Sequence, residues 1–198
     1  MADVPSRHEQ RKAATRQSLL DAARDVIAAK GYNETEILDI TEGANVSKAT
    51  FYKHFVNKED CVRELMQQGF DALVAQINSV DRSNLSTPDW VRQSFEQAFQ
   101  WADAHRVFLL LMVGGAASPS LNTFGRNYMV EVTRQQLNSH FTARDTTPRF
   151  PADIEAQIVT GIMVQLLGWW LENNTGYSAA DMAQFIQLAL KHGTRISP

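Results

Sequence analysis

Apolar side chains recur at helical spacing along most of the chain, and this periodicity constrains the fold more than any other feature. In the clearest stretch the apolar positions follow a period of about 3.6 residues: Val62, Leu65, Met66, Phe70, Leu73 and Ile77. The sequence has no sustained alternation of β-branched or aromatic residues with Asn-Gly or Asp-Gly turns between such runs, which is the pattern of β-hairpins. It therefore predicts an all-α protein with about nine helices.

Capping signals and breaks divide these helices into three units. Three predicted helix starts carry a capping residue followed three positions later by an acid: Ser6 with Glu9, Asn57 with Asp60, and Ser178 with Asp181. Residues 81–88 are polar and turn-rich, and they form the best domain boundary. We predict an N-terminal domain over residues 1–56, a connecting helix over 57–80, and a second helical domain over 81–198.

The charge of the chain is unevenly distributed. The 198 residues carry a net charge of −3, yet residues 46–58 hold three lysines and no acid. Residues 7–16 hold four basic residues and one glutamate. Such clusters occur on nucleic-acid-binding faces and on ordinary solvated faces, so the surrounding motif has to decide between the two.

The remaining composition indicates a soluble protein of a reducing compartment, which we expect to be cytoplasmic. The one cysteine, Cys61, cannot form an internal disulfide. The longest purely apolar run, 107–113, is far shorter than the roughly 20 residues that cross a bilayer, so no membrane partner is expected. Cys61 lies near a predicted helix N-terminus, which leaves two interpretations open: a redox-sensitive thiol or a packed core residue.

Residues 35–55 carry the motif that is most informative about function. Their apolar positions predict a short helix, a tight turn and a second helix that share one core. Asn45 lies where the turn needs a left-handed residue, and Ser47 then caps the second helix. Four solvent-facing side chains near the start of that helix can reach bases and phosphates in a major groove: Lys48, Thr50, Tyr52 and Lys53.

The segment from about residue 10 to residue 65 resembles the TetR family of bacterial transcriptional regulators. Residues 46–55, Val-Ser-Lys-Ala-Thr-Phe-Tyr-Lys-His-Phe, followed by a Lys-Glu pair at 58–59, are close to the signature of that family. Asn45 and Ala49 stand where the family commonly has glycine. The resemblance implies a dimer of all-helical subunits, each with a three-helix, helix-turn-helix DNA-binding head and a body that binds a ligand and dimerises.

Carried over position by position, the resemblance also implies which residues meet double-stranded DNA. The implied contacts are the capping residue together with the second helix and its end: Ser47, Lys48, Thr50, Tyr52, Lys53 and His54. Lys58, at the start of the connecting helix, is implied as a phosphate contact. Arg7, Arg11 and Lys12 lie outside the matched motif, and for them an arm on the phosphates and an ordinary solvated helix end are both open.

Aromatic residues and methionines are frequent in the second domain, and they have two interpretations. They can line a largely apolar pocket for a small-molecule effector, or they can be ordinary core. The predicted pocket residues are Trp101, His105, Phe108, Met112, Phe124, Tyr128, Met163 and Trp169. The apolar stripe on the last two helices predicts the homodimer interface: Ile158, Ile162, Leu166, Trp170, Phe185 and Ala189.

These observations favour a repressor that a small, largely apolar ligand releases from a palindromic operator. The alternative is a DNA-binding regulator of the same fold that responds to a protein partner or to its own abundance. An enzyme is a remote third hypothesis, because the sequence has no Gly-rich phosphate loop, nucleophile elbow or close His/Asp/Ser grouping. The five scattered histidines predict no metal site, and no cofactor is expected.

Overall fold

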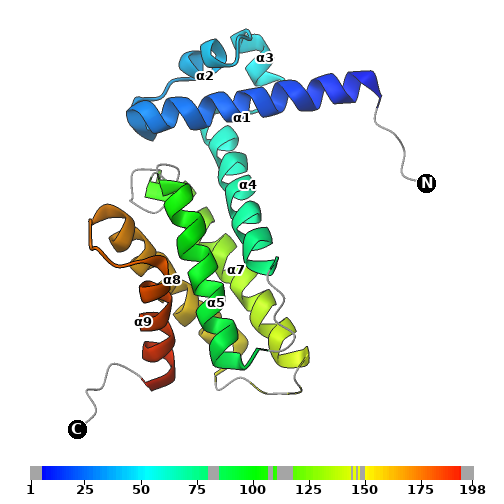
Figure 1. The fold of residues 1–198 in the computed structure, drawn as a ribbon. Helices are drawn as coiled ribbons and strands as arrows, with labels where there is room; N and C mark the ends of the chain where they lie inside the picture. The colour runs from blue at the N-terminus through cyan, green and yellow to red at the C-terminus, as the bar shows by residue number, and fades with distance from the viewer. Residues whose placement is uncertain are drawn as a thin grey trace.

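The chain folds into two groups of helices joined by one long helix (Figure 1). The computed structural model describes residues 6–79, 85–106, 109–110, 118–143, 145, 147 and 150–192. These described residues contain eight α-helices and no strand, so the all-α prediction is confirmed. Three helices form a head that lies across the N-terminal end of α4 (Lys58–Asn78): α1 (Arg7–Glu34), α2 (Ile37–Gly43) and α3 (Lys48–Tyr52).

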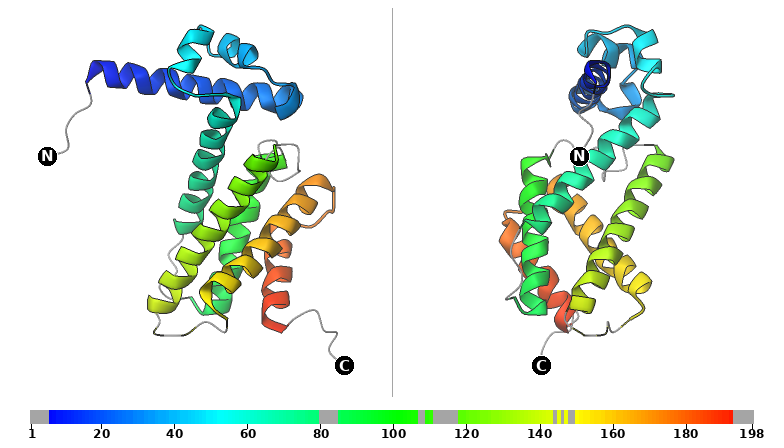
Figure 2. Two further views of the ribbon diagram at one scale, coloured as in Figure 1. Left: turned by 180° about the vertical axis from the view of Figure 1, so that it is seen from behind. Right: turned by 90° about the vertical axis from the view of Figure 1, so that its right-hand side faces the viewer.

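The remaining helices form a body around the other end of α4 (Figures 1 and 2). They are α5 (Thr87–Ala104), α7 (Pro119–Ala143), α8 (Ala152–Glu172) and α9 (Ala179–His192). The helix α5 packs along α9, α7 packs along α8, and α4 contacts both α5 and α7. Since α1 also packs on α4, this one helix belongs to the head and to the body.

The helix ends follow the capping signals of the sequence. The backbone N–H of Glu9 donates to the Ser6 hydroxyl at 3.3 Å, and the Glu9 carboxylate accepts the Ser6 N–H at 2.7 Å. The Asn57 Oδ1 accepts the backbone N–H of Asp60 at 2.8 Å. Gly31 has a φ of +83°, which disfavours other residues, so α1 is interrupted just before its last turn. Local sequence thus determines where α1 and α4 begin.

Arg16 of α1 joins α1 and the end of α3 to α4. Its guanidinium forms an ion pair with Glu64 of α4, with Nε 2.8 Å from Oε1, and it donates to the backbone carbonyl of His54 just after α3. Its Cζ also lies 4.2 Å from the centre of the Phe55 ring. A planar guanidinium can make these hydrogen bonds in fixed directions while stacking on a ring. Arg16 therefore helps to hold α3 in position relative to α1 and α4, together with the buried rings of Phe51 and Phe55.

The helices α4 and α7 approach closely at Gly125. A Cβ atom at this position would lie 2.9 Å from Cε of Met66 and 3.4 Å from the Phe70 ring. One turn later, Tyr128 stacks on Phe70 with 5.6 Å between ring centres and donates its hydroxyl to Asp71. Burial, and then the Asp71 carboxylate, raise the pKa of Tyr128 to about 12, so this donor stays protonated. The two helices are thus in direct contact on both sides of Phe70.

Cys61 lies in the core where α4 meets the head. Its side chain is fully buried, and burial followed by the charge of Glu64 raises the pKa of the thiol to about 12. The reactive thiolate form is therefore nearly absent at neutral pH. Of the two interpretations of Cys61, the structure supports the packed core residue.

Replacement of Arg16 by lysine should destabilise the chain, because one ammonium cannot serve the Glu64 carboxylate and the His54 carbonyl with the same geometry. We expect Arg16→Lys to lower the free energy of unfolding by about 1–3 kcal/mol. Arg24→Lys is the matched control, since Arg24 forms its ion pairs at the surface and the change should cost less than about 0.5 kcal/mol. Urea denaturation followed by circular dichroism measures both variants. Equal and small effects would contradict the role given to Arg16.

Candidate nucleic-acid interface and apolar cavities

The connection between α2 and α3 has the geometry of a helix-turn-helix. Asn45 has a φ of +52°, in the left-handed region, and the N–H of Val46 donates to the carbonyl of Thr41 at 2.9 Å. The hydroxyl of Ser47 accepts the N–H of Thr50 at 3.1 Å and so caps α3. The predicted left-handed residue and the predicted cap are both confirmed. Together they fix the direction in which α3 leaves the turn.

One side of α3 is anchored in the core and the other faces solvent. Phe51 is fully buried, and its ring stands edge-on to that of Tyr52 with 5.6 Å between centres. Lys48, Tyr52 and Lys53 are exposed, and the large ring of Tyr52 is 58% exposed. Thr50 is half-buried at the border of this surface. The exposed surface thus combines two cations, a phenol and a hydroxyl, which are groups that contact DNA bases and phosphates.

Positive charge surrounds His54 at the end of α3. The imidazole is half-buried, and its pKa is lowered first by burial and then by the charges of Arg16, Lys12 and Lys53. The lowered pKa favours the neutral imidazole, in which one ring nitrogen donates and the other accepts, and its Nδ1 is buried. Since Lys12 belongs to α1 and Lys53 follows α3, two helices contribute cations to one face. Such a face suits the phosphate backbone of a nucleic acid.

Lys58 is engaged inside the protein. Its Nζ donates to the backbone carbonyls of Tyr32 at 2.8 Å and Thr35 at 2.7 Å, and it lies 4.2 Å from the centre of the Tyr32 ring. Burial lowers the pKa of this half-buried ammonium. These contacts tie the start of α4 to the connection between α1 and α2. They suit a positioning role better than the phosphate contact that the resemblance implies.

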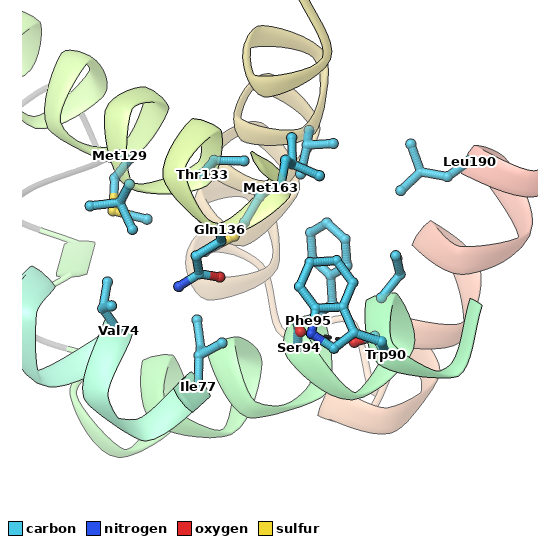
Figure 3. A pocket seen from close by; sticks show the side chains of 14 residues that line it. Val74, Ile77, Trp90, Ser94, Phe95, Met129, Thr133, Gln136, Met163 and Leu190 are labelled. Carbon is cyan, nitrogen blue, oxygen red and sulfur yellow. Dashed lines mark hydrogen bonds between the residues drawn. The ribbon is translucent and has the colours of Figure 1, made fainter. Parts of the chain in front are cut away.

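An apolar cavity of ≈ 80 Å³ lies in the body among α4, α5, α7, α8 and α9. Figure 3 shows Val74 and Ile77 pointing from α4 toward Met129 and Gln136 on α7. The residues that line the cavity are Val74, Ile77, Trp90, Val91, Ser94, Phe95, Met129, Val132, Thr133, Gln136, Leu137, Val159, Met163 and Leu190. None of these side chains is charged. We call this space the tail cavity.

A second cavity, of ≈ 270 Å³, lies closer to the head between α4, α7 and α8. The residues that line it are Phe70, Leu73, Leu109, Asn122, Gly125, Arg126, Met129, Met163, Val164 and Leu167. Met129 and Met163 line both cavities, and Arg126 is the charged residue of the combined lining. We call this space the head-side cavity.

The predicted pocket residues have different positions relative to these cavities. Met163 lines both of them. Trp101 and His105 stack on each other with 4.0 Å between ring centres and line neither. Phe108 and Met112 lie outside the described residues. The cavity walls therefore consist mainly of residues that the sequence did not single out.

The other three predicted pocket residues also lie outside both linings. The ring of Phe124 lies 5.7 Å from Cζ of Arg63, Tyr128 is bonded to Asp71, and Trp169 is 42% exposed. The residues missed on α4, α5 and α7 have the spacing of ordinary core side chains. The available signal was Arg126, a charged residue within one turn of the apolar positions of α7.

The helices α8 and α9 present apolar side chains on the outer side of the body. The large exposed ones are Ile154, Ile158, Trp169, Phe185, Leu188 and, at the edge of the tail cavity, Leu190. Three further residues of the predicted interface are half-buried: Ile162, Leu166 and Ala189. By length and composition α8 could cross a membrane, a test that core helices of soluble proteins also pass. Gly161 lies on the same face, where an added Cβ would meet no atom within 4 Å.

The sequence analysis placed Trp170 in the exposed stripe of α8, but in the structure Trp170 is buried and its neighbour Trp169 is exposed. Trp170 is 7% exposed, its Nε1 donates to the carbonyl of Tyr177 at 2.9 Å, and its ring stands edge-on to Phe99 at 5.3 Å. A helix turns about 100° per residue, so Trp170 lies about 120° around the helix from Ile158, whereas Trp169 lies about 20° from it. Positions chosen at intervals of four residues move about 40° around the helix at each step, so they do not stay on one face. For this reason the prediction that Trp170 shares the exposed stripe was wrong.

Two family profiles match the chain. One, described as "Bacterial regulatory proteins, tetR family", matches residues 19–65. The other, described as "Transcriptional regulator C-terminal region", matches residues 89–192, which is more than half of the chain. The first match spans the helix-turn-helix, and the second includes most of the body.

Known proteins with similar sequence or structure include regulators. The uncharacterized HTH-type transcriptional regulator YxbF of Bacillus subtilis is 22% identical over 185 residues, 90% of this chain and 45% of that protein. The HTH-type transcriptional repressor KstR2 of Mycobacterium tuberculosis is 27% identical over 96 residues, 48% of each chain. The chain thus spans less than half the length of these relatives.

The transcriptional regulator FadR from Bacillus subtilis, solved in complex with stearoyl-CoA, has the same fold. It superposes with a TM-score of 0.73 and 16% identity, covering 90% of this chain and 99% of that one.

Two lysine substitutions separate DNA contact from positioning. Lys53→Met should reduce the slope of log affinity against log salt for a mixed-sequence duplex by about 0.9, the value for one lost phosphate contact, and leave stability nearly unchanged. Lys58→Met should leave the slope unchanged but lower the free energy of unfolding by about 1.5–3 kcal/mol, because two carbonyls lose a charged donor. Fluorescence anisotropy and urea denaturation measure the two quantities. If Lys58→Met reduced the salt slope and left the free energy of unfolding unchanged, Lys58 would be a phosphate contact rather than a positioning residue.

Proposed function

The chain belongs to the tetR family of bacterial regulatory proteins, and from this premise we propose that it works in the cytoplasm as a homodimeric repressor. Membership makes it a transcriptional regulator rather than an enzyme. In the proposal, each subunit places α3 in a major groove of a palindromic operator. A small, largely apolar molecule in the body releases the protein from that DNA.

The head supplies the DNA contacts of the proposal. The exposed side chains of α3 stand beside a cationic face that Lys12 and Lys53 share. We assign base reading to Lys48 and Thr50. We assign phosphate contact to Tyr52 and Lys53, and to Ser47 and His54, which flank the two ends of α3. A repressor role is supported by KstR2, which is named a repressor.

The outer face of α8 and α9 supplies the dimer interface of the proposal. Its exposed apolar residues would remain in water in a monomer, and two copies can bury them as a four-helix contact about a two-fold axis. The predicted set therefore stays, with Trp169 in place of Trp170: Ile158, Ile162, Leu166, Trp169, Phe185 and Ala189. Gly161 lies among them and allows two α8 helices to cross closely.

The helix α4 carries the proposed release mechanism, because it is shared by the cavities and the head. Four of its residues line the two cavities: Phe70, Leu73, Val74 and Ile77. At its other end, Lys58 bonds the head, and Glu59 accepts the hydroxyls of Ser118 at 3.3 Å and Ser120 at 2.7 Å from the start of α7. A molecule that separates α4 from α7 must therefore also shift the support of the head.

A small-molecule effector is favoured over control by a protein partner or by abundance. The observation behind this preference is the pair of cavities between α4 and α7, which a ligand-free regulator has no need to keep. FadR, which shares the fold, is described in complex with stearoyl-CoA. Control by a partner or by abundance would be supported if no small molecule raised the melting temperature, since ligand at 100 times its dissociation constant adds about 2.7 kcal/mol of stability.

The preferred DNA site should be an imperfect palindrome. A two-fold dimer presents two equivalent α3 helices, so two related half-sites should lie about 34–36 Å apart, or one helical turn. In vitro selection from random duplexes, followed by footprinting, identifies the sequence and the protected face. Selection of one asymmetric half-site would contradict the dimeric mode of binding.

A charge at Gly161 should separate the subunits without unfolding them, because space around Gly161 is open in the single subunit. We expect Gly161→Arg to sediment as a monomer at micromolar concentration and to lose tight binding to the selected palindrome. Asn138→Arg, at an exposed position of α7, is the control and should remain dimeric. A dimeric Gly161→Arg would place the interface elsewhere.

A further inference from the structure

The two cavities share a wall made of flexible side chains. Met129 and Met163 line both, and both are buried, with 6% and 9% exposure. A methionine has three rotatable bonds and adapts to irregular spaces at small cost. Rotation of these two side chains would join the cavities into one elongated space that runs between α4 and α7.

The two ends of this space differ in polarity. In the tail cavity the hydroxyl of Ser94 donates to the carbonyl of Trp90 at 2.8 Å, and Thr133 accepts the hydroxyl of Thr160 at 3.0 Å. The amide of Gln136 donates to Asn78 at 3.5 Å. The two hydroxyls and the amide nitrogen of Gln136 thus have partners inside the protein. The remaining surface of the tail cavity is thus effectively hydrocarbon.

One cation, Arg126, lines the head-side cavity, one turn of α7 before Met129. Arg126 lines it and is exposed, so it stands where the cavity meets solvent. Among the described residues none forms an ion pair with Arg126. A guanidinium with free donors binds carboxylates and phosphates, in a bidentate manner where geometry allows.

We propose that the effector is a long unbranched acyl chain with an anionic head group, bound with its head at Arg126 and its tail past Met129 and Met163 in the tail cavity. This inference rests on the proposed function and names the ligand class of the same site. A slender chain is required because the tail cavity is small and the side chains of Met129 and Met163 separate it from the head-side cavity. The volume of the head-side cavity alone, ≈ 270 Å³, is near the lower end of ligand pockets, about 300–1,000 Å³.

Three probes with the same hydrocarbon tail distinguish the head groups: hexadecanoate, hexadecanoyl-CoA and hexadecanol. Titration calorimetry on the full chain below the micelle concentration should give tight binding for at least one anionic probe and weak binding for the alcohol. The two anionic probes distinguish a carboxylate from a thioester with remote phosphates. Shorter carboxylates should lose about fourfold in affinity per methylene removed, since each buried methylene contributes about 0.8 kcal/mol.

Arg126→Gln removes the charge and keeps a polar, uncharged side chain that is shorter than that of arginine. It should weaken binding of the preferred anionic probe by about 10- to 100-fold and change hexadecanol binding less than about twofold. Arg134→Gln is the matched control, because Arg134 is on the same helix, lines neither cavity and pairs with Glu131. Equal affinities for hexadecanoate, hexadecanoyl-CoA and hexadecanol, or an unchanged Arg126→Gln, would overturn the assignment of the head group.

The fluorescence of Trp90, which lines the tail cavity, can report which end of the acyl chain lies there. Bromine on the terminal carbon of hexadecanoate should quench tryptophan fluorescence more than bromine next to the carboxylate, and Trp90→Phe should remove the difference. Equal quenching, or octanoate binding as tightly as hexadecanoate, would overturn the joined site.

If the protein binds its selected palindrome but none of the probes, this inference is refuted and the repressor proposal stands. If the protein binds a probe but no DNA, the repressor proposal is refuted and the assigned ligand class stands.

Discussion

The contact of Arg16 with Glu64, with the carbonyl of His54 and with the Phe55 ring supports the arrangement of the head. The helix α3 has five residues, from Lys48 to Tyr52, and an isolated helix of that length is unstable in water. It persists because its N-terminus is capped, Phe51 is buried, and Arg16 holds its C-terminal end. The cap, the buried ring and the guanidinium together set how α3 lies relative to α1 and α4, and the exposed side chains of α3 depend on that orientation.

The same dependence continues into the body through α4. Its first two residues, Lys58 and Glu59, contact the head and the start of α7 respectively, and its later turns line the cavities. Gly125 brings α7 against α4 at the level of Met66. The helix is therefore packed against neighbours at both ends, and a change in its tilt cannot be confined to either half. The head and the body are therefore linked through the packing contacts of α4.

Features determined by neighbouring residues were predictable from the sequence. The caps at Ser6, Ser47 and Asn57 and the left-handed residue Asn45 follow from local chemistry, and the structure has all four. The positions of Trp169 and Trp170 needed the true helical pitch over three turns, and steps of four residues gave the wrong face. Cavities depend on which helices pack together and how closely, so their walls could not be read from one helix at a time. Lys58 illustrates the same limit, since its partners lie more than 20 residues earlier in the chain.

The burial of Cys61 has a practical consequence for observing this protein in motion. A fully buried thiol with a pKa of about 12 reacts slowly with maleimides and methanethiosulfonates, and the chain contains no second cysteine. The natural sequence therefore serves as a background for site-directed labelling. One cysteine introduced on the outside of the head would take up a spin label or a dye, and pulsed dipolar spectroscopy could then follow the head-to-head distance as DNA and effector compete.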